Sequence, residues 1–210
     1  LLTEWKGKET LWSSILFSLM LLVILSIALP ISSFPPQFLA GTFWITLFFS
    51  TSYALSRGFS KEADRETLDY LLMAPYPRGM LFFSKTLAVE IFVFGIGLVT
   101  LFFFVIFFHF PLNKIFLPFL FLLFISSWGL VVSGVFFGSL TARARTREMA
   151  FYLIVYPFLL PLLMASAWAS SSLVETGSLK YFTPWTLVFL FFDVFLTLVM
   201  YSLIEYILEG

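Results

Sequence analysis

One polar segment, SKEADRETLDYLLMA at residues 60–74, interrupts a chain that otherwise consists of long apolar runs. Ser60 can cap the first turn of a helix here, and the acidic residues that follow stand near the positive end of the helix dipole. Three leucines recur at helical spacing and form one apolar stripe, namely Leu68, Leu71 and Leu72. Pro75 ends the pattern, because the residue before a proline is pushed out of the α region. The segment is therefore predicted to be a short amphipathic helix.

This helix could lie on the lipid surface or dock on another protein. Helices that lie on lipid favour Lys and Arg on their polar face. Here acidic residues outnumber basic ones on the polar side, which carries Glu62, Asp64, Arg65, Glu66 and Asp69. Anionic headgroups repel such a face. We therefore favour a protein partner over the lipid surface.

Composition points to a membrane protein. Of the 210 residues, 60% are hydrophobic and 11% are charged, and the mean hydropathy is +1.01. Apolar runs of about 20 residues can span a bilayer as helices, and these runs lack the alternating polarity of a transmembrane barrel. The net charge is zero, which argues against nucleic acid as a partner, and the absence of cysteine excludes disulfides and thiolate metal sites. The predicted fold class is an all-α polytopic membrane protein.

Proline-rich and charged turns divide the sequence into six predicted transmembrane helices. They are expected at residues 11–29, 38–56, 80–108, 114–140, 149–170 and 185–206. Pro157 and Pro161 predict a kink in the fifth helix. Together the spans form a single transmembrane domain over residues 1–210, with no extramembrane domain. Because the sequence begins at Leu1 rather than at a methionine, we expect a few residues to precede it.

Basic residues predict the orientation in the membrane. Ten of the twelve Lys and Arg residues fall on one predicted side, and only Lys114 and Lys180 fall on the other. The ten are Lys6, Lys8, Arg57, Lys61, Arg65, Arg78, Lys85, Arg143, Arg145 and Arg147. Cytoplasmic loops carry the excess of positive charge. Both termini and both charged loops are therefore expected to be cytoplasmic.

The sequence lacks a motif for ATP hydrolysis. The only Gly-Lys pair, Gly7-Lys8, is followed by Glu9 and has no upstream glycine of a phosphate-binding loop. Metal-ligand spacings, a nucleophile elbow and paired histidines are also absent from the sequence. The chain is thus not expected to be an enzyme or to bind a metal, and energised transport would need another subunit. The only histidine, His109, is either a haem ligand or an interfacial residue beside a proline turn, and we favour the second.

Two acidic residues lie deep within predicted spans. Glu90 is about ten residues into the third span, a rise of about 15 Å, and Asp193 is about eight residues into the sixth, about 12 Å. A carboxylate near the midplane is costly and usually faces the bundle interior. Each is either a protonated or hydrogen-bonded packing residue or part of a substrate or conformational pathway. Lys85, by contrast, is expected to snorkel to the membrane surface.

Small and aromatic residues bear on how the helices pack. Gly134 and Gly138 lie on one face of the fourth span, where they would permit a close helix contact. The 30 phenylalanines are expected mainly to face lipid.

The central loop resembles that of ABC-2-type exporter permeases. In that family the first cytoplasmic loop carries an acid-rich helix reading GTLE-x-LL-x-x-P, followed by a lysine that opens the third span. Residues 66–75, ETLDYLLMAP, are similar to this pattern, with Glu66 at the glycine position and Lys85 as the lysine. The resemblance implies a six-helix permease fold in which residues 60–74 are a coupling helix. It also implies that an ATP-binding cassette subunit docks on Glu66, Leu68, Asp69, Leu71 and Leu72.

Within that group the chain most resembles the CcmB family, the haem exporter permeases of cytochrome c maturation. The chain length, the basic loop TARAR at residues 141–145, and YPFLLPLL at residues 156–163, which resembles an LP-x-x-x-P pattern, suggest this branch. The resemblance implies an integral haem-handling protein, a periplasmic haem chaperone and a second copy of the chain as partners, besides membrane lipids. It implies the bacterial inner membrane as location and haem as cargo, with no cofactor bound by this chain alone.

Two other functions fit the sequence. An ABC-2-type permease that exports a lipid, a drug or a glycan would have much the same pattern. A membrane-anchor subunit of a respiratory complex is an alternative of another class, but such anchors usually hold haem with paired histidines inside the membrane. This chain has no histidine within a predicted span.

Overall fold

The computed structural model describes residues 2–29, 35–63, 78–112, 115–141, 147–176 and 179–209. Almost all of these residues are helical, and none of them forms a strand. In chain order the helices are α1 (Leu2–Ala28), α2 (Pro36–Ala63), α4 (Arg78–Phe108), α5 (Phe116–Thr141), α6 (Arg147–Thr176) and α7 (Leu179–Glu209).

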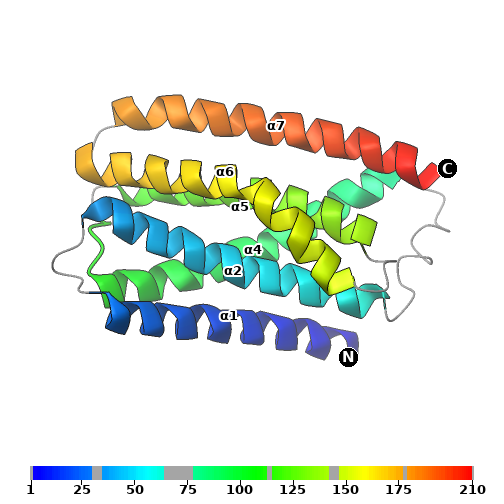
Figure 1. Cartoon of the computed structure of the whole chain (residues 1–210), viewed down its shortest axis with the longest axis horizontal. Helices are drawn as coiled ribbons and strands as arrows, with labels where there is room; N and C mark the ends of the chain where they lie inside the picture. The colour runs from blue at the N-terminus through cyan, green and yellow to red at the C-terminus, as the bar shows by residue number, and fades with distance from the viewer. Residues whose placement is uncertain are drawn as a thin grey trace.

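The helices form a bundle along one long axis. Successive helices run in opposite directions, so that both ends of the chain lie at the right-hand end of the bundle in Figure 1. Within the described residues, five helices contain segments long and apolar enough to cross a bilayer: Glu9–Ala28, Phe38–Phe59, Gly79–Phe108, Phe116–Thr141 and Met149–Thr176. The fold class is thus confirmed as an all-α polytopic membrane protein.

The sixth predicted span corresponds to α7. This helix is long, but its described apolar stretch is the shorter segment Leu187–Leu203. Such a stretch is at the short end of the range of about 17–25 residues that transmembrane helices use.

Helix α2 extends beyond the predicted end of the second span at residue 56. Arg57, read from the sequence as the start of a loop, donates a hydrogen bond from Nη1 to the hydroxyl of Tyr53, one turn earlier, at 2.7 Å. Phe59 is buried, and the helix continues to Ala63. The first four residues of the predicted coupling helix therefore continue α2, and residues 64–74 lie outside the described part of the chain.

Helix α6 also continues past its predicted end at residue 170. The serine-rich stretch that suggested a loop is helical, and its hydroxyls are satisfied within the helix by carbonyls of the preceding turn. Ser170 donates to Ser166 O at 2.8 Å, and Ser172 donates to Ala169 O at 2.9 Å. Pro157 and Pro161 lie inside this helix, and α6 bends along its length as Figure 1 shows, in agreement with the predicted kink.

Helix α5 is the centre of the bundle. It packs against α2, α4, α6 and α7, and 78% of its apolar segment is buried. Only 22% of the corresponding segment of α1 and 28% of that of α6 are buried, so these two helices have broad outward faces. The residues at the centre of the bundle are therefore those that face α5.

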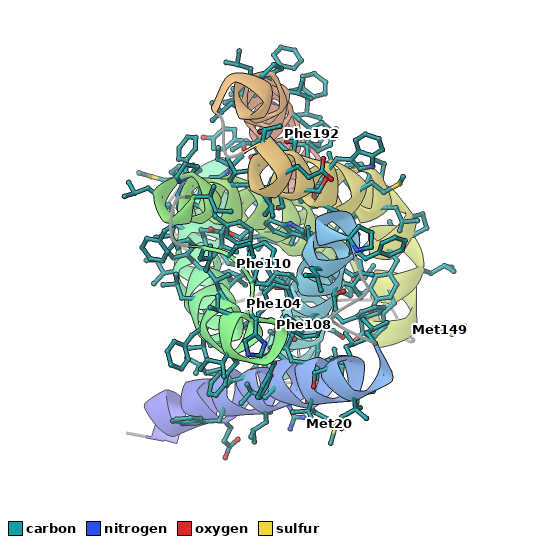
Figure 2. All side chains as sticks on the ribbon, turned by 90° about the vertical axis from the view of Figure 1, so that its left-hand side faces the viewer. Met20, Phe104, Phe108, Phe110, Met149 and Phe192 are labelled. Atoms are coloured by element: carbon teal, nitrogen blue, oxygen red, sulfur yellow. The ribbon has the colours of Figure 1, made fainter. Side chains whose placement is uncertain are left out.

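A cluster of aromatic rings joins α2, α4 and α5 at the end of the bundle where α4 stops. Phe43 lies 5.3 Å from Phe104 and 5.4 Å from Phe119, measured between ring centroids. Figure 2 looks along the bundle from this end and shows Phe104, Phe108 and Phe110 inside it, whereas Met20 lies on its outside. The expectation that phenylalanines mainly face lipid is wrong for this group, because an apolar ring gains packing contacts inside the bundle that lipid tails do not supply with fixed geometry.

Candidate functional site

Glu90 is buried on α4 and faces the central helix. Its side chain is 3% exposed, and Ser127 of α5 donates a hydrogen bond to Oε1 at 2.6 Å. Among the described residues, the second carboxyl oxygen, Oε2, has no hydrogen-bond partner. One oxygen of the carboxyl group is thus anchored and the other is left without a donor.

Asp193 approaches the same part of α5 from α7. It is 5% exposed, and its Oδ1 lies directly against Gly129, where an ideal Cβ would be only 2.6 Å from this oxygen. Leu162 of α6 closes the other side, because its Cδ2 would be 2.9 Å from the same Cβ. Asp193 Oδ1 has no hydrogen-bond partner in the described part of the chain. The missing side chain of Gly129 provides the space for this carboxyl group.

The two acidic residues that the sequence singles out therefore pack on the same turn of α5, Glu90 at Ser127 and Asp193 at Gly129. They reach it from α4 and α7, two helices that also pack on each other. The sequence offers no cation to neutralise them, because α5 has no charged residue and neither α4 after Lys85 nor the apolar stretch of α7 contains Lys, Arg or His. The arrangement is a pair of like groups in the apolar interior, not an ion pair.

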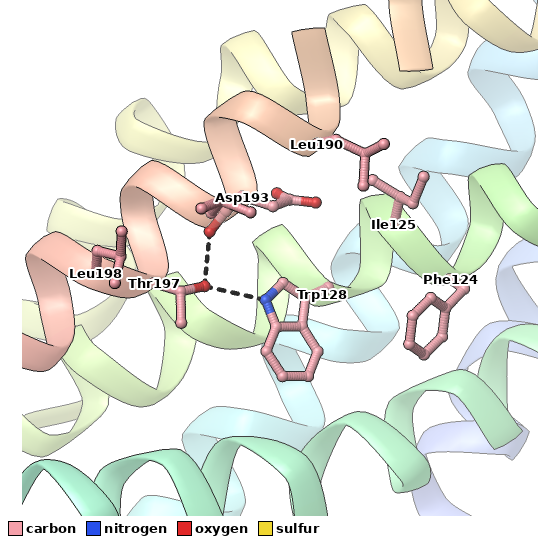
Figure 3. A pocket seen from close by; sticks show the side chains of 8 residues that line it. Phe124, Ile125, Trp128, Leu190, Asp193, Thr197 and Leu198 are labelled. Carbon is pink, nitrogen blue, oxygen red and sulfur yellow. Dashed lines mark hydrogen bonds between the residues drawn. The ribbon is translucent and has the colours of Figure 1, made fainter. Parts of the chain in front are cut away.

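A pocket of about 390 Å³ lies between α5 and α7 on the side of Asp193. Its wall includes Phe124, Ile125 and Trp128 of α5 and Leu190, Asp193 and Thr197 of α7. Trp128 donates from Nε1 to the hydroxyl of Thr197 at 3.1 Å, and that hydroxyl donates to the carbonyl oxygen of Asp193 at 2.6 Å (Figure 3). This chain of bonds fixes the turn of α7 that carries Asp193 against α5.

The predicted packing glycines face α2. A Cβ at Gly134 would meet Leu55, and a Cβ at Gly138 would meet the ring of Phe59. Lys85 also contacts that ring, with its Nζ 4.0 Å from the ring centroid. Lys85 was expected to reach for the membrane surface, and the structure places its ammonium group on an aromatic ring near the end of α2, a favourable cation–π contact.

His109 lies in the turn that follows α4. Its side chain is exposed, and its φ of 49° places it in the left-handed region, which histidine adopts more readily than most residues. The described residues contain no group of three His, Cys, Asp or Glu side chains that could hold a metal ion. The predicted docking residues Glu66, Leu68, Asp69, Leu71 and Leu72 lie outside the described residues.

Several residues that surround the two carboxyl groups were not predicted from the sequence. Ser127, Trp128, Gly129 and Thr197 each contact Glu90 or Asp193 or fix the turn that carries Asp193. The available signal was the run Ser126-Ser127-Trp128-Gly129 inside an apolar span. Small polar residues within transmembrane helices commonly mark helix interfaces.

The comparisons with known proteins give one match. A family model described as CcmB protein matches residues 2–204 of the chain. Neither the comparison with curated proteins nor that with solved structures finds a match.

Proposed function

Because the chain belongs to the CcmB protein family, we propose that it couples ATP hydrolysis by a partner subunit to the delivery of haem for c-type cytochromes. Family membership makes the chain a multi-pass permease component of an ABC transporter for haem in cytochrome c maturation. It is not itself the ATPase, and it belongs to a complex with an ATPase subunit. The observation that carries the proposal is a family match over nearly the whole chain.

The proposed coupling step acts through residues 60–74. This segment joins the end of α2 at Ala63 to the start of α4 at Arg78, at the end of the bundle where both termini lie (Figure 1). The excess of Lys and Arg in the sequences at this end supports its placement on the cytoplasmic side of the membrane. The membrane itself is proposed to be the bacterial inner membrane. The ATPase subunit docks on the leucine stripe, and Glu66 and Asp69 provide polar contacts.

The proposed cargo is haem, which this chain does not grip by its iron. One exposed histidine and no cysteine give the sequence no pair of strong iron ligands. An integral haem-handling protein and a periplasmic haem chaperone therefore hold the haem, and the permease drives its transfer or the release of the loaded chaperone. Two copies of the chain form the transmembrane part of the complex.

The first test replaces a leucine of the docking stripe. Burying a leucine contributes about 1.5–3 kcal/mol, and Leu71→Asp removes this contribution and adds an unpaired charge at the contact. We expect the ATPase subunit to separate from Leu71→Asp when the complex is purified from membranes, and c-type cytochromes to be lost from the cells. Glu62→Gln, in the same segment but outside the leucine stripe, should keep both.

Other results would contradict the proposal. Co-purification of the ATPase subunit with Leu71→Asp, with undiminished coupling of ATP hydrolysis, excludes this helix as the dock. Normal c-type cytochromes in cells that lack the chain favour the export of a lipid, a drug or a glycan. Co-purification with the subunits of a respiratory complex favours the anchor function.

A further inference from the structure

Glu90 and Asp193 are both buried against one turn of the central helix α5, and the described helices that pack there bring no positive charge to it. Every helix that packs on the pair is free of basic residues at this depth. Helix α5 contains no ionisable residue, and α6 contains none between Tyr156 and Glu175. The nearest cation on α4, Lys85, precedes Glu90 by more than one turn and lies on the ring of Phe59.

Two ionised carboxylates are not tolerated in such a place. An isolated charge in an apolar interior costs several kcal/mol even after relaxation, and a second negative charge on the same turn of α5 adds repulsion between like groups. One oxygen of each group, Oε2 of Glu90 and Oδ1 of Asp193, lacks a hydrogen-bond partner in the described structure, although both side chains are more than nine-tenths buried. The pair therefore requires a ligand that brings positive charge or a hydrogen-bond donor.

A proton fits this requirement better than a metal ion does. Bound Ca²⁺ or Mg²⁺ needs about six or more oxygen ligands. Ser127 adds one hydroxyl oxygen to the two carboxyl groups, and the neighbouring side chains on the Asp193 side include the apolar Leu162, Leu190 and Phe124. A proton needs only one of the unpartnered oxygens.

We propose that Glu90 and Asp193 form a proton-binding site within the membrane, in which Asp193 carries the proton and Glu90 is the second carboxyl group of the site. The hydroxyl of Ser127 donates to Glu90 and so stabilises negative charge on that group. Asp193 Oδ1 instead lies against Gly129 and beside Leu162, without a donor. The surroundings thus favour negative charge on Glu90 and a bound proton on Asp193.

The pocket between α5 and α7 allows the proton on Asp193 to be tested by chemical labelling of the carboxyl group. Asp193 lines the pocket of about 390 Å³, whereas Glu90 is not part of its wall. The remaining wall is almost entirely apolar, so a small apolar reagent can reach Asp193 from the lipid. Dicyclohexylcarbodiimide is such a reagent, and it reacts with protonated carboxyl groups in apolar surroundings.

The experiment treats the intact complex in its native membranes with dicyclohexylcarbodiimide and locates the label by peptide mass spectrometry. We expect one label per chain, on Asp193. Asp193→Asn should abolish the labelling, and Glu90→Gln should retain it. Glu175, exposed at the end of α6, serves as the control carboxyl group and should react with a water-soluble carbodiimide only.

Infrared spectroscopy of the same protein detects a protonated carboxyl group directly, without a reagent that has to reach Asp193. The wild type should show the C=O stretch of a protonated carboxylic acid, and Asp193→Asn should lose it. Glu90→Gln should keep the band but shift it, because its neighbour has changed, and Glu175→Gln should leave the band in place. A thermal melt of each variant establishes that it is folded.

Three results would overturn the proposal. The first is a label on Glu90 in place of Asp193. The second is the absence of a protonated carboxyl band from the folded wild type. The third is protection of Asp193 from the reagent by Na⁺ at constant pH, which would make the pair a metal-cation site.

Discussion

Gly129 shows how one residue sets the spacing of three helices. Its missing side chain admits Asp193 of α7, and Leu162 of α6 lies against the same point. A methyl group at Gly129 would lie 2.6 Å from Asp193 Oδ1, which is far inside contact distance. The buried carboxyl group could move away only by separating α7 from α5, because the wall of Trp128 and Thr197 holds it in place.

We therefore expect Gly129→Ala to lower the free energy of unfolding by about 1–3 kcal/mol, the usual cost of overpacking. The matched control is Gly95→Ala, since a Cβ at Gly95 meets nothing within 4 Å. The measurement is the midpoint of denaturation of the purified protein in detergent. Equal midpoints for the two variants would contradict the close contact between Gly129 and Asp193, and Asp193→Ala should rescue Gly129→Ala by restoring space.

His109 allows a test of whether this chain holds the haem iron. The side chain is exposed in the turn after α4, and its backbone is in the left-handed region. His109→Asn removes the imidazole, while asparagine tolerates this conformation. We expect His109→Asn to support c-type cytochrome assembly at near-normal yield, as judged by haem staining of membrane proteins.

Leu71→Asp is the control for this measurement, because its loss of cytochromes shows that the assay responds to the permease. If His109→Asn lost cytochrome assembly while it remained inserted and bound to its ATPase, the residue would be a haem contact. The haem path would then pass the end of α4.

At the scale of elements, small residues and hydroxyl groups fix which helices touch. Ser126 of α5 accepts a bond from Ser166 of α6 at 3.0 Å, and Trp44 of α2 donates to Ser170 of α6 at 2.7 Å. Each such bond between membrane helices is worth about 0.6 kcal/mol on average. Close packing against glycine therefore has to contribute much of the specificity of these contacts.

The contact between α2 and α5 can be tested with two glycines that differ in their neighbours. A Cβ at Gly138 would meet the rigid Phe59 ring, on which Lys85 also packs, whereas a Cβ at Gly134 would meet the end of the flexible Leu55 side chain. We expect Gly138→Ala to destabilise the protein by about 1–3 kcal/mol. Gly134→Ala should be near neutral, because Leu55 can change rotamer and alanine is the better helix former by about 1 kcal/mol.

A double-mutant cycle decides the cause. Phe59→Leu should recover most of the stability lost in Gly138→Ala, and it should have no such effect on Gly134→Ala. If the two alanine variants melted alike, the ring of Phe59 would not be the obstacle.

The existence of these helices was predictable from the sequence, but which face of each helix packs on which neighbour was not. Hydropathy identified the six helices because long apolar runs exclude other structures in lipid. It missed the extension of α2 through Arg57, since the bond from Arg57 to Tyr53 depends on the helix being already formed. It also missed that the phenylalanines of the aromatic cluster lie inside the bundle, because the inside and the outside of a membrane bundle are equally apolar. Glu90 and Asp193 were identified by their cost in the membrane, whereas their meeting at Gly129 depends on how three helices pack.

At the scale of the whole molecule, the central position of α5 connects the two ends of the bundle. Its first half packs in the aromatic cluster, its middle carries the turn that faces Glu90 and Asp193, and its second half packs on Leu55 and Phe59 of α2. A change in the charge of the carboxyl pair would alter the packing of α4 and α7 on α5. Because the proposed coupling segment joins α2 to α4, a shift of α4 would be transmitted to the segment on which the ATPase subunit is proposed to dock.

The direction of this bundle in the membrane is the last prediction. The alternating helices place the α5–α6 connection at the end of the bundle that holds both termini, and the α6–α7 connection at the other end (Figure 1). Since ten of the twelve Lys and Arg residues belong to the first end, we expect that end to be cytoplasmic.

The chain has no cysteine, so single cysteines can report each end. Gly177→Cys should react with a membrane-impermeant thiol reagent applied to cells whose outer membrane has been made permeable, and Thr146→Cys should react only after the inner membrane is disrupted. The opposite pattern would invert the molecule and place residues 60–74 on the side where no ATP is available, which would exclude the proposed coupling.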